Sequence, residues 1–133
     1  MNLSPHHWLV VLLLSVGVSG CIILESDRSY SGGDVYRYCP EGGCYVACGS
    51  AYSCVVDCPG GDCIVDCQNA DFCQVNCDRG YCDTYCQNAY ECETNCPDGG
   101  CHVECDDADR CSSYCGGWGC SVDCDYARVC RRR

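Results

Sequence analysis

Short stretches in which small apolar and polar residues alternate recur along residues 39–133. In Cys63-Ile-Val-Asp-Cys67 and in Cys101-His-Val-Glu-Cys105, two cysteines and a central valine occupy every second position. Side chains at every second position of a β-strand lie on one face, so each stretch is predicted to be a short strand with its cysteines facing inward. The central positions of the nine stretches hold only small or β-branched residues: Val46, Val56, Val65, Val75, Thr84, Thr94, Val103, Ser113 and Val122.

The cysteine spacing repeats every 19 residues. From Cys39 onward, successive cysteines are separated by 5, 4, 6 and 4 positions, and the series then repeats through five units. A constant period near 20 residues is typical of repeat proteins whose units stack on one another. The longer gaps, which are rich in Pro and Gly or carry Ala at their third position, predict turns. The sequence therefore predicts an all-β fold, a small two-sided parallel β-solenoid of five coils.

An α-helix is the alternative, because cysteines at i and i+4 also share a helical face. The five- and six-residue steps rotate the next pair off that face, and valine at the centres of the short stretches favours strands. In architecture, the expected solenoid resembles the disulfide-laced antifreeze proteins of beetles. Ice binding itself is not expected, because the outward columns are mixed and form no threonine ladder.

Geometry limits how the twenty repeat cysteines can pair. Pairing within the columns made by the 19-residue period leaves one orphan in each column, because every column holds five. Pairing each cysteine with the next one across a turn uses all twenty, at a Cα separation of about 5.5 Å that disulfides favour. The predicted bridges are Cys39–Cys44, Cys48–Cys54, Cys58–Cys63, Cys67–Cys73, Cys77–Cys82, Cys86–Cys92, Cys96–Cys101, Cys105–Cys111, Cys115–Cys120 and Cys124–Cys130.

The composition supports this picture of a stapled fold. The chain has 133 residues and 21 cysteines, whereas Phe, Met and Trp together number four. A short exported chain with so few large apolar residues depends on disulfides in place of an ordinary core. The net charge of −11 and the absence of lysine argue against a nucleic-acid partner.

The N-terminus has the pattern of an export signal. The apolar run from Trp8 to Val18 is too short to span a bilayer and has the length of a signal-peptide core. Val18-Ser19-Gly20-Cys21 resembles a bacterial lipobox, although His6 and His7 stand where such leaders carry Lys or Arg. The resemblance implies cleavage before Cys21 and attachment of a diacylglycerol to its sulfur. An ordinary secretory signal is the alternative.

Three segments follow from these observations. Residues 1–20 are predicted to be a signal peptide, 21–38 a lipid-anchored tether with an N-terminal cap over 34–38, and 39–133 the solenoid. Cys21 is the odd cysteine, and lipidation would account for it. Ile22 after it resembles outer-membrane rather than inner-membrane lipoproteins, so we expect an exported outer-membrane or cell-surface protein. Arg132 falls in the next inward slot, which favours a monomer because it ends the stack.

Metal binding is the main alternative function. Twenty thiolates could hold Cu(I) or Zn(II), but the chain lacks the C-x-C and C-x-x-C spacings of thiolate sites. Calcium is the second possibility, because it binds clustered carboxylates. Its candidate ligands are Asp106, Asp107, Asp109 and Asp125, although the full glycine-aspartate pattern of repeat-in-toxin proteins is missing. We therefore commit to no metal or other cofactor beyond this possible calcium ion.

Catalysis is not expected. His102 is the only histidine after Cys21, and no nucleophile elbow, zinc-protease or phosphate-loop motif is present in the sequence. Ten tyrosines and Trp118 are of the residue types that interfaces favour. The sequence predicts a non-enzymatic, disulfide-stabilised structural or interaction module of the cell envelope, with a protein or glycan as its unknown partner.

Overall fold

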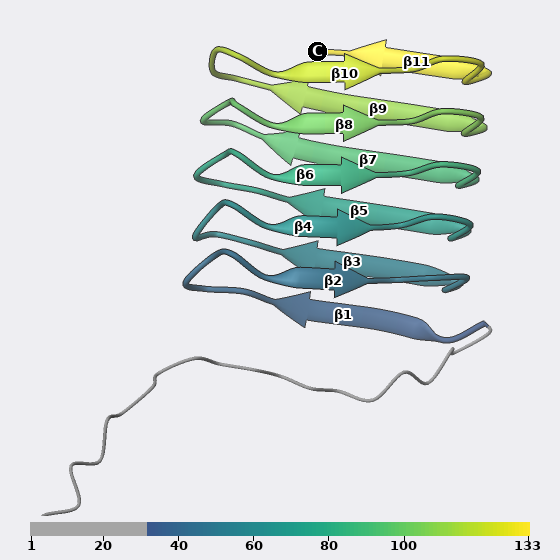
Figure 1. Cartoon of the computed structure of the whole chain (residues 1–133), viewed down its shortest axis with the longest axis horizontal. Coiled ribbons are helices and arrows are strands. Elements are labelled where there is room, and N and C mark those ends of the chain that lie inside the picture. Colours follow the sequence, from purple (N-terminus) through teal and green to yellow (C-terminus); the bar gives the residue numbers. More distant parts are fainter. Residues whose placement is uncertain (1–31) are drawn as a thin grey trace, which may run out of the picture.

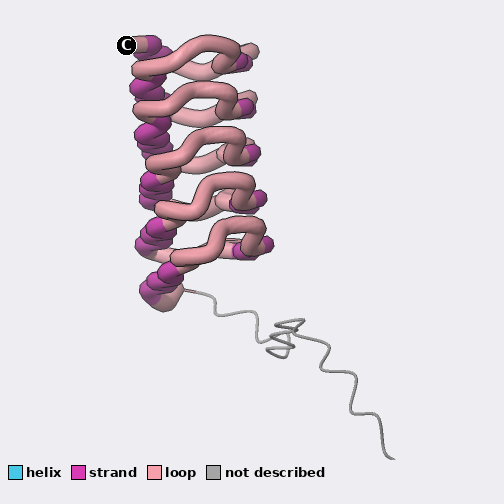
Figure 2. The backbone as a smooth tube through the Cα atoms, turned by 90° about the vertical axis from the view of Figure 1, so that its left-hand side faces the viewer, coloured by secondary structure: helices cyan, strands magenta, loops and turns pink. Residues whose placement is uncertain are grey.

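The computed structural model describes residues 32–133, which form a stack of flattened coils with one parallel sheet on each side (Figures 1 and 2). Sheet A has the order β1-β3-β5-β7-β9-β11, with β1 at Asp34–Tyr38, β3 at Ser53–Asp57, β5 at Phe72–Asn76, β7 at Glu91–Cys96, β9 at Arg110–Cys115 and β11 at Val129–Arg132. Sheet B has the order β10-β8-β6-β4-β2, with β2 at Tyr45–Ala47, β4 at Ile64–Asp66, β6 at Asp83–Tyr85, β8 at His102–Glu104 and β10 at Ser121–Asp123. The predicted β-solenoid of about five coils is confirmed.

The register of both sheets follows the 19-residue period. Cys54 pairs with Cys73 in sheet A, and Val65 pairs with Thr84 in sheet B. Equivalent residues of successive coils therefore form columns along the stack, and each column keeps one orientation. The inward columns contain the cysteines and the small or β-branched residues predicted from the alternation.

These inward columns make up the core. The inward valines of the inner coils are at most 5% exposed, and Thr84, Thr94 and Ser113 are buried in the same slots. None of the buried residues in the described range is aromatic. Burial of cysteine and valine therefore replaces the aromatic and leucine-rich core of an ordinary domain.

The five-residue gaps form tight turns that explain their constant alanine. In each turn the carbonyl of the preceding cysteine accepts a hydrogen bond from the alanine amide, as between Cys67 and Ala70 at 3.1 Å. In four of the five turns the residue before the alanine has positive φ, as with 61° at Asn69 and 57° at Asn88. This is the conformation of a type II turn, for which Asn or Gly is suited. Ala70 and its equivalents in the inner coils are about 1% exposed, so a larger side chain would not fit.

The four-residue gaps approach one another so closely that one position requires glycine. A Cβ atom on Gly80 would lie 2.0 Å from the carbonyl oxygen of Gly99 in the next coil. The equivalent position of the last coil is Trp118, which is 96% exposed and has no coil above it. A side chain is therefore tolerated at this position only at the end of the stack.

Ten disulfides staple the turns in the pairing predicted from the spacing, with Cα–Cα separations of 5.9–6.4 Å. Each joins the end of a strand in one sheet to the start of the next strand in the other sheet. The ladder thus links the two sheets on both sides of every coil.

The structure adds details that the alternation does not contain. Strands of sheet A extend over four to six residues, whereas those of sheet B have three. The last residue of each five-residue gap continues the extended backbone of sheet A. β1 pairs with β3 and covers the residues expected to cap the first coil. No helix that could span a membrane is found among residues 32–133.

Candidate functional site

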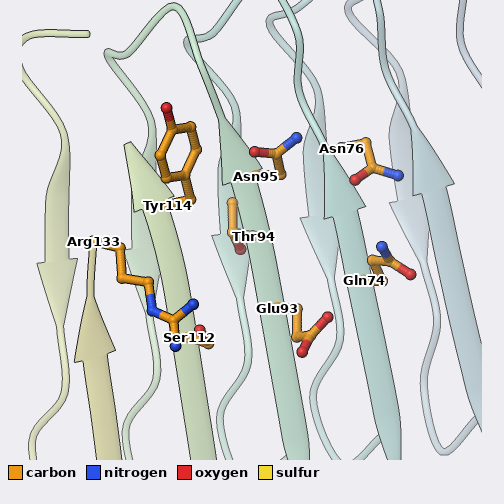
Figure 3. A pocket seen from close by; sticks show the side chains of 8 residues that line it. All are labelled: Gln74, Asn76, Glu93, Thr94, Asn95, Ser112, Tyr114 and Arg133. Carbon is orange, nitrogen blue, oxygen red and sulfur yellow. The ribbon is translucent and has the colours of Figure 1, made fainter. Parts of the chain in front are cut away.

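The outer face of sheet A carries a shallow polar depression that crosses β5, β7 and β9. Its volume is about 330 Å³, and Figure 3 shows the side chains around it. Asn76, Asn95 and Tyr114 belong to one outward column, and Gln74, Glu93 and Ser112 to the next. The residues that line it are Gln74, Asn76, Glu93, Thr94, Asn95, Ser112, Tyr114 and Arg133.

This depression offers many hydrogen-bonding groups. The amides of Gln74, Asn76 and Asn95 supply both donors and acceptors, and Tyr114 adds a ring that is 49% exposed. A neighbouring depression of about 500 Å³ places Glu91 and Glu93 near Arg110, Arg131 and Arg133. Together the two form a surface suited to polar contacts with a partner.

One end of the same face is ordered by hydrogen bonds between coils. The Asn76 side-chain amide donates to Asp57 at 2.6 Å, and the Tyr36 hydroxyl donates to the other oxygen of Asp57 at 2.8 Å. The hydrogen bond to Asp57 raises the pKa of the Tyr36 hydroxyl above its usual value, and desolvation adds to the shift. These contacts hold side chains from three coils in fixed positions.

A second candidate lies at the edge of sheet B, where four carboxylates form a two-by-two array, here called the acidic corner. Glu104 pairs with Asp123 in the register of β8 and β10, and Asp106 and Asp125 follow them by two residues in the adjoining turns. One carboxylate oxygen of Asp106 is buried and has no hydrogen-bond partner among the described residues. Desolvation, followed by the negative charges of Asp123 and Asp125, raises the pKa of Asp106 above its usual range.

The acidic corner differs from the calcium site expected from the sequence. Asp106 and Asp125 belong to it, whereas Asp107 is exposed at a turn position with φ of 56°. Asp109 lies 3.6 Å from Arg128, with which it forms an ion pair. Sequence reasoning took the four aspartates from the turns. It missed Glu104 and Asp123, although their position two residues before the turn, 19 residues apart, could have revealed them.

His102 lies on the outer face of sheet B and is partly exposed. Its ring nitrogen is 3.1 Å from a carboxylate oxygen of Glu104, and its ring meets that of Tyr85 edge-on at 6.5 Å. These contacts account for its position as a surface strand residue. Within residues 32–133, the hydrogen-bond partner of the ring is the Glu104 carboxylate.

Stacking brings sulfur atoms closer than the sequence argument assumed. That argument considered only the spacing of cysteines along the chain, but the sulfurs of Cys58, Cys63 and Cys82 lie within 4.8 Å of one another across two coils. Such groups of three recur along the stack. In the bridged structure these sulfurs form disulfides and are not thiolates. The spacing of the chain alone is therefore not an argument against thiolate sites in a reduced protein.

Cys21, predicted to carry the lipid, lies outside the described residues, as do the signal peptide and most of the tether. Comparison with known proteins found no family model, no curated protein and no solved structure that matches the chain. The functional argument therefore depends on the geometry of residues 32–133 and on the sequence of the N-terminus.

Proposed function

We propose that the protein is an exported, lipid-anchored module of the bacterial cell envelope that holds a binding surface in a rigid frame. One observation carries this proposal: every cysteine of the solenoid is bridged, which suits an oxidising compartment, and the remaining Cys21 lies in a lipobox-like motif. Because the bridges and inward columns maintain the fold, the outward side chains are free to serve contacts. We assign the protein a non-catalytic role and an outer-membrane or cell-surface location.

The intact mass of the mature protein, before and after reduction and alkylation, tests the first half of this proposal. We expect a lipid adduct, the loss of residues 1–20, and twenty cysteines that become alkylated only after reduction. A Cys21→Ser variant exported behind an ordinary secretory signal in place of residues 1–20 should leave the membrane fraction and appear as a soluble species. A mature protein without a lipid adduct would overturn the anchor and leave a secreted module.

The binding surface is tested by site-specific photo-crosslinking in cells. A photoreactive residue at Glu93, on the outer face of sheet A, should give a defined crosslinked product. The matched control is Asp98, which is also exposed but lies in a turn. Crosslinking that is equally weak at both positions would argue for a purely structural module.

A second candidate function, calcium binding, is favoured by the acidic corner. A divalent cation would neutralise the repulsion among the four carboxylates and could ligate the unpartnered oxygen of Asp106. Calorimetric titration with calcium chloride should show one site, which Asp106→Asn abolishes and Asp78→Asn leaves intact. Equal heats for wild type and Asp106→Asn would sink this candidate.

A further inference from the structure

The tyrosines of the solenoid are concentrated at the end from which the N-terminal segment leaves. Eight tyrosines are strongly exposed in the described residues, and four of them lie between residues 34 and 52. The next 19 residues contain no tyrosine or tryptophan. The four are Tyr36 at 58%, Tyr38 at 61%, Tyr45 at 68% and Tyr52 at 66% exposure.

These side chains surround the first coil rather than forming a patch on one side. Tyr36 and Tyr38 face outward from β1 in sheet A, and Tyr45 faces outward from β2 in sheet B. Tyr52 lies in the turn from β2 to β3. Ile64, 41% exposed, pairs in register with Tyr45 and extends the apolar surface along sheet B. Of the four hydroxyl groups, that of Tyr36 donates a hydrogen bond to Asp57 of β3. This bond fixes the ring of Tyr36 on the edge strand β1.

Charge is distributed unevenly along the stack. Residues 32–52 contain two carboxylates and one arginine, residues 53–109 contain thirteen carboxylates and one arginine, and residues 110–133 contain two carboxylates and five arginines. The tyrosine-rich end is therefore almost neutral, the middle coils are strongly acidic, and the last coil is basic. Figure 1 places β1 and the arginine-bearing β11 at opposite ends of the stack.

We propose that the tyrosines of the first coil seat the solenoid on the lipid headgroup surface, so that the stack stands upright with its acidic coils directed away from the membrane. This inference deepens the proposed function, since it depends on lipidation of Cys21. Tyrosine favours the membrane interface because its ring is apolar and its hydroxyl stays hydrated. Anionic headgroups repel the acidic middle coils, which disfavours a solenoid that lies flat. The choice between the two ends comes from the anchor at Cys21 and the tyrosines, because charge alone would also attract the arginines of the last coil.

The length of the tether permits this contact without enforcing it. Twelve residues lie between Cys21 and Asp34, and the thirteen steps from one Cα to the next could span at most about 45 Å when fully extended. The first coil could therefore lie at the bilayer or well above it. The four exposed tyrosines of the first coil favour the position at the bilayer, because their rings would be partly removed from water there.

Fluorescence quenching by brominated lipids tests the orientation with a matched pair of reporters. Tyr38 and Tyr114 occupy the same outward column of sheet A, four coils or roughly 19 Å apart. After removal of the leader, Trp118 is the only tryptophan, so a Trp118→Phe background leaves no other signal. The acylated protein is reconstituted into phosphatidylglycerol–phosphatidylethanolamine vesicles, with Tyr38→Trp or Tyr114→Trp as the single reporter.

We expect Tyr38→Trp to lose roughly half of its emission in brominated vesicles, because interfacial side chains lie at the headgroup level. Tyr114→Trp should lose almost none, and neither should the native Trp118 at the far end of the stack. Equal quenching of both reporters would mean that the solenoid lies flat. If the protein floats with the vesicles but the emission of Tyr38→Trp is not quenched, the protein is anchored and its first coil does not contact the membrane. Both outcomes overturn the proposal.

A second measurement needs no substitution in the solenoid. Chemical nitration mapped by mass spectrometry should mark Tyr45 and Tyr52 at least twofold less in the vesicle-bound protein than in a soluble Cys21→Ser protein. Tyr81 and Tyr126 should react equally in both. If the soluble protein already protects the first coil and sediments as a dimer, its partner is a second copy and the proposal fails.

The two proposals can fail separately. An intact mass without a lipid adduct would contradict the lipid anchor, and the proposed contact between the first coil and the membrane would fail with it. A lipid adduct combined with an unquenched Tyr38→Trp removes only the orientation. The mass measurement is therefore made on the same preparation that is reconstituted.

Discussion

At the residue scale, a hydroxyl group lies where the core otherwise holds valine. Thr84 is paired in register with Val65 on one side and Val103 on the other, and its hydroxyl oxygen is buried without a hydrogen-bond partner among residues 32–133. A buried polar group without a hydrogen bond costs about 1–3 kcal/mol. Valine has nearly the same shape and lacks this group.

We predict that Thr84→Val raises the free energy of unfolding of the oxidised protein by about 1 kcal/mol, measured by guanidinium denaturation. The reverse change one coil away, Val65→Thr, should lower it by a similar amount. A lower stability of Thr84→Val would mean that the hydroxyl group has a hydrogen-bond partner in solution.

Asp106 is expected to make stability depend on pH. Its pKa is raised in the folded state, chiefly by desolvation and then by Asp123 and Asp125. The folded protein therefore binds this proton more tightly than the unfolded chain does, and stability falls as pH rises from the usual carboxyl range through the raised value. The effect is complete once Asp106 is fully ionised.

Asp106→Asn should accordingly be more stable than wild type at neutral pH and equal to it at about pH 3, below the ordinary aspartate pKa. Thermal unfolding in chelator-containing buffer across this range measures the difference. Asp78→Asn, which changes an exposed carboxylate remote from the acidic corner, should track wild type. A constant offset for Asp106→Asn at all pH values would contradict the prediction.

At the scale of single elements, the turns between sheets A and B depend on glycine for two separable reasons. Gly80 has φ of 78°, and a Cβ there would meet the next coil; Gly43 has φ of 69° but open space around a Cβ. An Ala at positive φ costs about 1 kcal/mol by conformation alone.

We predict that Gly43→Ala lowers the free energy of unfolding by about 1 kcal/mol, whereas Gly80→Ala lowers it considerably more because the coils must also separate. Thermal denaturation of the two oxidised variants provides the comparison. Similar losses would show that the stack can adjust its spacing and that close approach of the turns is not a constraint.

At the scale of the whole molecule, the disulfide ladder replaces a conventional core. Each bridge closes a loop of six or seven residues and contributes about 2 kcal/mol by the chain-entropy estimate. Few buried side chains are larger than valine, so apolar burial alone is weak. We predict that full reduction at neutral pH abolishes the β-sheet circular dichroism of the repeats. Retention of that signal with all twenty thiols free would show that burial suffices.

Much of this architecture could be predicted from the sequence because the signal repeats. One coil alone would leave strand and helix open, but five units with the same spacing let the alternation, the turns and the even number of cysteines support one another. The 19-residue period by itself predicts that Val65 stacks on Val46 and Cys73 on Cys54, and the register of the sheets agrees. Each column contains five cysteines, so pairing within a column would leave one cysteine unpaired. Disulfides across the turns were therefore the pairing that used all twenty.

The functional surfaces could be predicted only in part. The aspartates of two successive turns were visible as a cluster, yet the acidic corner combines only Asp106 and Asp125 with Glu104 and Asp123 from the strands. Likewise, the polar depression on sheet A joins residues from four coils, none of which is unusual within its own unit. Both surfaces depend on how columns lie beside one another, which the order of residues in one coil does not express.

Period, strand alternation and cysteine parity were therefore determined by the sequence alone, because each follows from spacing along the chain. Only the tertiary structure decided which outward side chains meet, how closely the glycine turns approach and which end of the stack exposes its tyrosines. Those properties arise from contacts between neighbouring coils, and they depend on the distance and lateral offset between columns as well as on their composition.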